Sequence, residues 1–362
     1  MKKLSKNAKS NAITYGIVVV FYIVMQLLVS SGSLTSSLAG QLIPICVYIC
    51  MAVSLNLTVG ILGELSLGHA GFMSVGAFTG VIVAMSLQPT IASGPVRLLL
   101  AMIIGGVMAA IVGVLVGVPV LRLRGDYLAI VTLAFGEIIK NILNNLYVAY
   151  DAAGLHVKLL TAINKADLTD GGFLIINGPQ GATGITKLST FTAGFLLILF
   201  TLFVVLNLIQ SRSGRAIMSI RDNRIAAESV GINVTKYKLM AFVVSAALAG
   251  MAGALYAMNF TGVAAKKFDF NTSILVLVFV VLGGMGNIRG SIIAAAVLYV
   301  LPELLRAVNN YRMLFYAIVL IVVMLVTNNP TLKNGLAAVG SALKGVFIKS
   351  VPVPEEGGKD DE

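Results

Sequence analysis

The chain has 362 residues, of which 58% are hydrophobic and 11% are charged, and its mean hydropathy is +0.95. Because soluble domains carry about a quarter charged residues, this composition excludes a soluble fold and predicts a polytopic membrane protein. The net charge of +11 does not indicate a nucleic-acid partner, since the basic residues lie mostly at the ends of apolar segments and in alternate loops, where they set orientation in the bilayer.

The apolar segments predict an all-α protein with about ten membrane-spanning helices, because each span needs about 20 mostly apolar residues. The first segment imitates a signal peptide, but its apolar run is long and no cleavage site follows it, so we interpret it as an uncleaved span. The eighth and ninth segments are short and interrupted by glycine, which leaves their boundaries poorly defined. In chain order, the predicted spans are residues 13–31, 38–59, 69–87, 96–121, 127–149, 191–209, 239–260, 272–284, 291–307 and 313–327.

Basic residues predict the orientation of these spans. Four lysines lie in the N-terminal segment 1–12, and six arginines and lysines lie in segment 211–238, between the sixth and seventh spans. By the positive-inside rule, both segments and both chain termini are cytoplasmic. Residues 13–345 then form one transmembrane domain with a long external loop at 150–190, and residues 346–362 form a cytoplasmic tail.

Segment 211–238 does not have the composition of a simple loop. RDNRIAAESVG, at residues 221–231, combines good helix formers with a glycine at which a helix can end. A structured, charged helix on the cytoplasmic face predicts a docking partner there, and a solvated loop that only sets topology is the alternative.

Two glycine-rich segments interrupt apolar stretches, at residues 60–80 and 283–291. Paired interruptions of this kind point to a translocation pathway near the bilayer midplane, whereas small residues also allow close helix packing. We expect both roles for the first segment and leave the role of the second open. The two ionisable residues of the first segment have simpler alternative roles: Glu64 could be a carboxylate at the membrane interface, and His69 could form a hydrogen bond to a neighbouring helix. The candidate pathway residues of the first segment are Glu64, Ser66, Gly68, His69, Gly71 and Ser74.

The fifth predicted span carries two opposite charges, Glu137 and Lys140. Residues three apart share a helix face, so these two are expected to pair. Glu137 lies roughly 17 Å from the cytoplasmic end of this span, near the middle of a ~30 Å hydrocarbon core. We therefore count Glu137 as a further pathway candidate, with a structural ion pair as the alternative.

Motifs for catalysis are missing from the sequence. It has no G-x-x-x-x-G-K-[ST] nucleotide-binding loop, and its two histidines, His69 and His156, lie far apart without a cluster of metal ligands or an activated nucleophile around them. The two cysteines, Cys46 and Cys50, lie inside an apolar run and are expected to be buried small side chains. The sequence therefore predicts a chain that is not an enzyme and that binds no metal or cofactor.

Several long motifs resemble the permease subunits of branched-chain amino acid ABC importers. They are LSLGHAGFMSVGAFTG at 65–80, LRLRGDYLAIVTLAFGEII at 121–139, GRAIMSIRDNRIAAESVGINVTKYKLMAFVVSAALAGMAGALYA at 214–257 and VLGGMGNIRGS at 281–291. The resemblance covers residues 40–325 and is to the longer of the family's two permease subunits. It implies a multi-pass protein of the plasma membrane that carries branched-chain or related amino acids. The implied partners are a second permease, two cytoplasmic ATPase subunits that use ATP, and an external substrate-binding protein.

The resemblance also implies a role for the coupling loop, residues 211–238. Such permeases carry an E-A-A-x-x-x-G pattern in the helix that docks on the ATPase; here Ala226, Ala227 and Gly231 match, while Ile225 replaces the acidic residue. External residues 151–176 depart from the family pattern, so no contact is carried over there. A stand-alone, ion-coupled secondary transporter working through Glu64, His69 and Glu137 is the alternative. The implied coupling residues are Arg221, Asp222, Arg224, Ala226, Ala227, Glu228 and Gly231.

Overall fold

The computed structural model describes residues 6–32, 35–123, 125–151, 154–163, 172–305 and 311–328. The chain divides into two compact units, Met1–Leu304 and Leu305–Glu362. In the second unit the described residues form helix α12, Arg312–Asn328. The predicted tail, 346–362, lies outside the described residues, as do parts of the external stretch 151–176.

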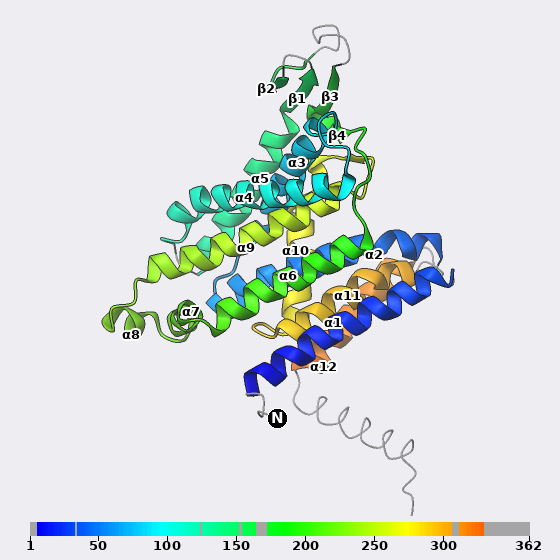
Figure 1. Cartoon of the computed structure of the whole chain (residues 1–362). Coiled ribbons are helices and arrows are strands. Elements are labelled where there is room, and N and C mark those ends of the chain that lie inside the picture. The colour runs from blue at the N-terminus through cyan, green and yellow to red at the C-terminus, as the bar shows by residue number, and fades with distance from the viewer. Residues whose placement is uncertain are drawn as a thin grey trace, which may run out of the picture. The chain divides into compact units, whose positions relative to one another are not determined.

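Long helices make up most of the first unit (Figure 1). Each of the first nine predicted spans overlaps one of them, and the tenth overlaps α12, so the all-α membrane architecture is confirmed. Helix α1 begins inside the predicted N-terminal segment 1–12. The helices of the membrane region are α1 (Lys6–Ser30), α2 (Ser36–Asn56), α3 (His69–Ser86), α4 (Gly94–Val120), α5 (Asp126–Asn144), α6 (Phe191–Gln210), α9 (Val234–Ala257), α10 (Phe270–Gly283) and α11 (Ile288–Leu304).

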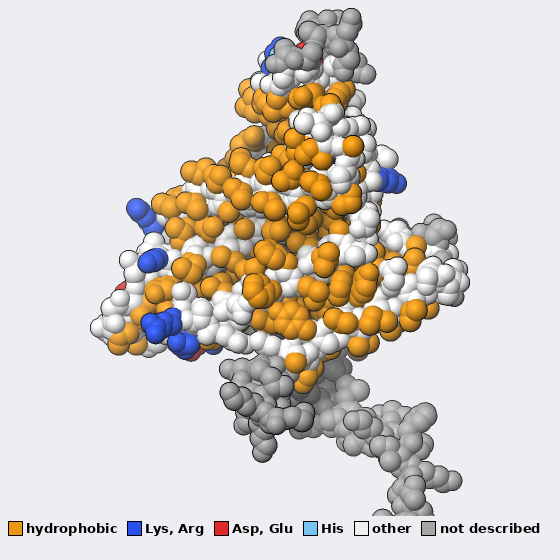
Figure 2. Space-filling view, in the orientation of Figure 1, with side chains coloured by type: hydrophobic (Ala, Val, Ile, Leu, Met, Phe, Trp, Pro, Cys, Tyr) orange, Lys and Arg blue, Asp and Glu red, His pale blue; other side chains and the backbone are white. Residues whose placement is uncertain are grey.

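Six helical segments among the described residues are long and apolar enough to cross a membrane. The exposed side chains of these helices are largely apolar, and Figure 2 shows them covering much of the face that carries α4 and α6. The protein is therefore a multi-pass protein of the cell membrane, while the number of spans and the side on which the termini lie stay predictions. The six segments are Asn11–Ser30, Ser37–Leu62, His69–Ser86, Gly94–Val120, Phe191–Gln210 and Val234–Ala257.

Helix α2 is the centre of the first unit. Its membrane-crossing window is completely buried, and it contacts α6, α9, α10 and α11. Its last turns continue as a π-helix, η1 (Leu57–Leu62), which ends at Gly63 in the left-handed region with φ of 80°. The predicted second span, 38–59, therefore extends to Leu62 before the chain leaves the helix.

The predicted C-terminal end of the fifth span is wrong. That span was expected to reach residue 149, but α5 ends at Asn144 and the chain enters strand β1 at Leu146. The sequence LYVAYD is rich in β-branched and aromatic side chains, and β1 gains a partner on each side, which explains why strand replaces helix. Residue Val148 pairs with Val157 on one side and with Ile176 on the other.

The long external loop is consequently not a bare connection. Together with β5, which comes from the connection between α9 and α10, it forms a five-stranded sheet in the order β2-β1-β3-β4-β5, with the antiparallel β1–β2 hairpin at one edge. The external stretch that departs from the family pattern supplies β2 and most of β3. The strands are β1 (Leu146–Asp151), β2 (Gly154–Leu159), β3 (Phe173–Asn177), β4 (Ala182–Thr183) and β5 (Gly262–Val263).

Candidate functional site

The coupling loop folds into two short helices, α7 (Arg212–Asp222) and α8 (Arg224–Ser229). The expected helix is interrupted at Asn223, which has extended backbone angles and whose side chain accepts a hydrogen bond from the N–H of Ala226 at 3.0 Å. This cap satisfies one of the donors at the start of α8. At the other end, Gly231 has φ of 83° and ends the helix, as the sequence predicts.

Helix α8 presents an apolar face to solvent. Ile225 is 80% exposed and Val230 is 75% exposed, and the ion pair between Arg224 and Glu228, at 2.9 Å, lies beside them. Basic side chains gather at the end of the molecule where α7 and α8 lie (Figure 2). We call Ile225, Ala226, Ser229 and Val230 the coupling face. An exposed apolar patch rimmed by charges is typical of a protein-binding surface.

Ala227 faces the other way. It is only 3% exposed and packs with Ile220 of α7 and Val234 of α9. Of the two alanines of the family pattern, one is therefore available to a partner and the other anchors α8 to its own protein. This distinction is invisible in the motif, since adjacent positions on a helix point in different directions.

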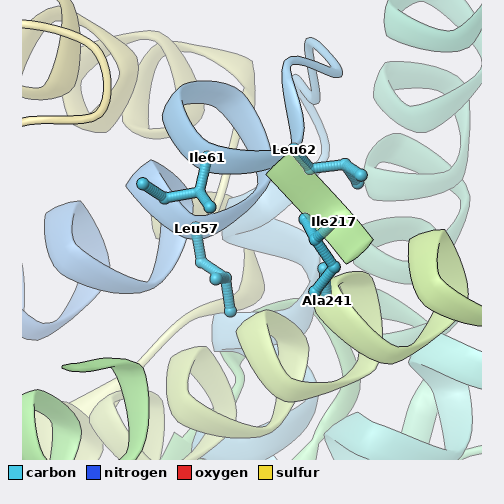
Figure 3. Close-up of a cluster of buried hydrophobic side chains, with 5 residues drawn as sticks. All are labelled: Leu57, Ile61, Leu62, Ile217 and Ala241. Atoms are coloured by element: carbon cyan, nitrogen blue, oxygen red, sulfur yellow. The ribbon is translucent and has the colours of Figure 1, made fainter. Parts of the chain in front are cut away.

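The inner side of α7 is tied to the end of α2. Ile217 packs in a buried cluster with Leu57, Ile61 and Leu62 of η1 and with Ala241 of α9 (Figure 3). This cluster packs α7 directly against η1 and α9, and densely packed interiors transmit strain.

Two charged side chains add polar links at the same place. Arg221 Nη1 donates a hydrogen bond to the carbonyl oxygen of Gly60 at 3.2 Å, while its Nη2 and Nε donate to Asp222 Oδ1 at 2.9 and 3.0 Å. Lys238, in the second turn of α9, forms an ion pair with Glu64, immediately after η1. The Lys238 side chain is only 4% exposed, so this pair is poorly screened by solvent.

Residues 63–68 form the break between η1 and α3, and hydrogen bonds attach its end and the first residues of α3 to α5, α10 and α2. The N–H of Leu67 donates to Thr132 Oγ1 of α5 at 3.1 Å, and the N–H of Ala70 donates to Ser273 Oγ of α10 at 3.1 Å. His69 Nε2 lies 2.9 Å from Ser54 Oγ of α2. The hydrogen bond expected for His69 is therefore confirmed.

The predicted pathway residues of the first glycine-rich segment are mostly buried. Ser66, Gly68, His69, Gly71 and Ser74 are all enclosed within the protein. Gly68 and Gly71 lie against α5: a Cβ on Gly68 would overlap the carbonyl oxygen of Thr132, and one on Gly71 would lie 3.0 Å from Gly136 Cα. The packing role is thus observed, while the pathway role stays a prediction.

The second glycine-rich segment contacts the first. Asn56 Nδ2 donates to Ser291 Oγ at 2.9 Å, and the N–H of Gly286 donates to Asn56 Oδ1 at 2.8 Å. A Cβ on Gly60 would overlap the backbone of Gly286. The sequence left the role of segment 283–291 open between a translocation pathway and close packing, and the structure shows that this segment packs against η1.

Glu137 and Lys140 form the predicted ion pair on α5. Both side chains are partly exposed. The positive charge of Lys140 also interacts electrostatically with Asp269, the N-cap of α10. Burial raises the pKa of Asp269, but hydrogen bonds from Thr272 and Asn271 and the charge of Lys140 outweigh it, so the pKa lies below its usual value. This pair therefore belongs to an electrostatic contact between α5 and α10.

Sequence reasoning missed Lys238, Thr132, Ser273 and Asn56 as site residues. For Thr132, Ser273 and Asn56 the available signal was a polar side chain within an apolar segment. Lys238 was counted only as a basic residue of the coupling loop. Among the described residues, no three His, Cys, Asp or Glu side chains come together in a group able to hold a metal ion.

Comparison with known proteins shows the family of this chain. The family model described as "Branched-chain amino acid transport system / permease component" matches residues 12–324. The high-affinity branched-chain amino acid transport system permease protein LivM of Escherichia coli (strain K12) is 37% identical over 287 residues, 77% of this chain and 66% of that protein, so the chain spans slightly less than two thirds of it.

More distant relatives widen the comparison. The permease protein LivH of Salmonella typhimurium is 24% identical over 284 residues, 77% of this chain and 89% of that protein. The nucleoside ABC transporter permease protein NupC of Lactococcus lactis is 27% identical over 212 residues, 55% of this chain and 60% of that protein. No solved structure matches. The chain belongs to the family of permease components of branched-chain amino acid transport systems.

Proposed function

We propose that this chain is a non-catalytic permease subunit of an ATP-driven importer. It forms part of a translocation path for branched-chain or related amino acids together with a second permease. Two cytoplasmic ATPase subunits supply the energy, and an external binding protein delivers the substrate. Family membership supports this proposal, and so do the names of LivM and LivH, which are permeases of branched-chain amino acid transport systems.

One observation carries the mechanism: the helices that bear the coupling face are joined to the break at residues 63–68. The ATPase subunits bind the coupling face of α8, and their closure displaces α7 and α8. The Ile217 cluster, the Arg221 hydrogen bond to Gly60 and the Glu64–Lys238 ion pair carry this displacement to the break. The coupling role of Arg221, Asp222, Arg224, Ala226, Ala227, Glu228 and Gly231 is included in this proposal.

From the break, the displacement reaches the helices that border the path. Residues 67–70 bind α5 through Thr132 and α10 through Ser273. Helix α5 has one exposed face along which Ile130 and Ile138 recur, and Glu137 lies beside it, partly exposed. We propose that α5 borders the path together with Glu137, and that Ser66, Gly68, His69, Gly71 and Ser74 lie behind it and become accessible when the break moves.

The substrate class rests on relatives and needs its own test, because NupC is named a nucleoside permease. The external binding protein selects the solute in this scheme, so its ligand defines the substrate. Binding of leucine, isoleucine and valine, but not of nucleosides, by the cognate binding protein is the expected result. A binding protein that takes only nucleosides would move the proposal to another substrate.

The transporter class is tested by purification and reconstitution. The chain should co-purify with a second permease and two ATPases, and proteoliposomes containing all of them should take up leucine only with ATP and binding protein. The matched control is this chain reconstituted alone, which should be inactive. Uptake by the chain alone, driven by an ion gradient, would establish the secondary transporter instead.

A further inference from the structure

Strand β2 carries an apolar face that takes no part in the mechanism above. Leu155 is 46% exposed, Val157 is 57% exposed and Leu159 is 53% exposed. Because alternate residues of a strand lie on the same face, these three side chains share one face of β2, and Lys158 lies on the opposite face. We call Leu155, Val157 and Leu159 the hairpin face.

On the neighbouring strands the same face of the sheet is buried. Directly opposed residues of antiparallel strands lie on one face. Val157 pairs with Val148 of β1, and Val148 pairs with Ile176 of β3. Val148 and Ile176 are both 0% exposed. The core of the external sheet therefore continues onto β2 as an apolar surface that the described residues leave exposed.

The segment of this chain between β2 and β3 is poorly suited to cover the hairpin face. Its residues 164–171, NKADLTDG, lie outside the described residues and contain one large apolar side chain, Leu168. Strand β2 is also the edge strand of the sheet. An apolar edge strand exposed to water is prone to aggregation, so native proteins normally cover or blunt it. A cover supplied by another chain fits these observations.

The composition of the hairpin face favours a partner that stays bound. The face consists of three aliphatic side chains without a charge, and permanent interfaces are more apolar than those of partners that bind and leave. An external binding protein that delivers a substrate and departs would leave this face in water between visits. A permanently bound chain would cover it throughout.

The position of β2 favours a partner within the membrane. The N–H of Leu160, immediately after β2, donates a hydrogen bond to the carbonyl oxygen of Asn145 at 2.9 Å, immediately after α5. Helix α5 leads into the sheet (Figure 1), and its exposed side chains Ile138 and Ile142 are also apolar. Hydrophobic side chains extend from the region of β2 toward α5 (Figure 2). A membrane protein can cover α5 and β2 together, whereas a soluble protein cannot reach a helix inside the bilayer.

We propose that the hairpin face is a docking surface for the second permease subunit. The inference rests on the proposed function, which supplies that subunit. Strand β2 packs against an apolar external surface of the second permease, while α5 faces its membrane helices across the path. Because β2 comes from the external stretch 151–176, which departs from the family pattern, this contact distinguishes the cognate second permease from other permeases of the family.

Photo-crosslinking in the full importer tests this surface. Benzoylphenylalanine replaces Val157, or Lys158 as the matched control on the opposite face of the same strand. The complex with the ATPases and the binding protein is irradiated, and the adducts are identified by mass spectrometry. We expect position 157 to give an adduct with the second permease at a yield about tenfold or more above that of position 158, because the two side chains lie on opposite faces. Equal yields, or adducts only with the binding protein, a second copy of this chain or lipid, would overturn the assignment.

A charge on the hairpin face provides a second measurement. With the cross-linker moved to Leu155, Val157→Glu should lower the yield of the adduct about tenfold, because it puts a carboxylate into an apolar interface. Lys158→Glu puts the same carboxylate on the opposite face and should keep the wild-type yield. Both side chains are exposed in the free chain, so neither variant should prevent folding. An unchanged yield in Val157→Glu would contradict the proposal.

The outcomes separate this inference from the proposed function. A second permease that co-purifies with the chain but gives no adduct from position 155 or 157 would overturn the docking surface and leave the importer in place. Absence of a second permease from the purified wild-type complex would overturn both.

Discussion

The two glycine-rich breaks look alike in sequence but differ in what surrounds them. The break after η1 holds Glu64 and contacts Arg221 and Lys238, and residues 67–70 at its end bind α5 and α10 through Thr132 and Ser273. The break between α10 and α11 is tied to η1 through Asn56. We infer that the first break transmits motion, whereas the second supports the first. Glycine content alone does not distinguish these roles; the polar partners do.

The largest effect is expected at the Glu64–Lys238 pair. Glu64→Gln or Lys238→Met leaves one charge without its partner in a buried place, which costs about 3–5 kcal/mol. Each single variant should lower folded yield and leucine uptake per ATP hydrolysed. The double variant should recover yield because no charge is left unpaired.

The recovery of the double variant separates two roles of this pair. If uptake per ATP stays low after yield recovers, the pair transmits motion, as the account requires. If uptake recovers together with yield, the pair is only structural. Arg122→Gln serves as a control, since it removes an exposed positive charge that takes no part in this pair.

A smaller effect is expected where the two breaks touch. Gly60→Ala places a methyl group against the Gly286 backbone and Asn56, and overpacking of this kind costs typically about 1–3 kcal/mol. Gly40→Ala is the matched control, because Gly40 lies in α2 with nothing within 4 Å of an added Cβ. Thermal unfolding should show a lower Tm for the first variant and an unchanged or higher Tm for the second. Equal behaviour of the two would show that the breaks are not closely packed.

A substitution on the coupling face should weaken binding of the ATPase subunits without changing the stability of the chain. Ile225→Asp puts a charge on a side chain that is exposed in the free chain, so folded yield should not change. Capture of the ATPase subunits in a pull-down should fall at least tenfold, a loss of about 1.4 kcal/mol, while Ile225→Leu should keep it. Undiminished capture by Ile225→Asp would mean that the ATPase binds elsewhere.

The Glu137–Lys140 pair should show the mildest effect on stability, because both side chains remain partly exposed. Lys140→Met should slightly weaken the α5–α10 contact by removing the positive charge near Asp269. Glu137→Gln should change uptake more than Tm if α5 borders the path. A loss of Tm without a loss of uptake would assign the pair to packing alone.

How far the sequence predicts this structure depends on the range of the contacts. Apolar segments predict the helices closely; α3 begins at His69, where the sequence predicts the third span to begin. Local rules also predict the Glu137–Lys140 pair. Such local rules cannot predict the partner of Glu64, because Lys238 is 174 residues away along the chain. The external sheet was missed because β1 is stabilised by partners on both sides and its residues also suit the end of a span.

The coupling motif shows a similar limit. The pattern selects Ala226 and Ala227 equally, yet Ala227 is buried against Ile220 and Val234. Ala227→Arg should therefore disturb the folding of α8 as well as docking, which makes it a poor test of docking alone. The exposed Ile225, where this chain departs from the family pattern, is the better site to probe.

Transmission from the coupling loop to the break is tested most directly by the accessibility of Leu65, which lies in the break and is partly exposed. Leu65→Cys is made in a chain whose Cys46 and Cys50 are replaced by alanine, and its reaction with a small water-soluble thiol reagent is timed in the full complex with and without ATP. The account predicts that ATP changes this rate and that adding Lys238→Met removes the change while ATP hydrolysis continues. A rate that is insensitive to ATP, or an ATP response that persists in Lys238→Met, would contradict it.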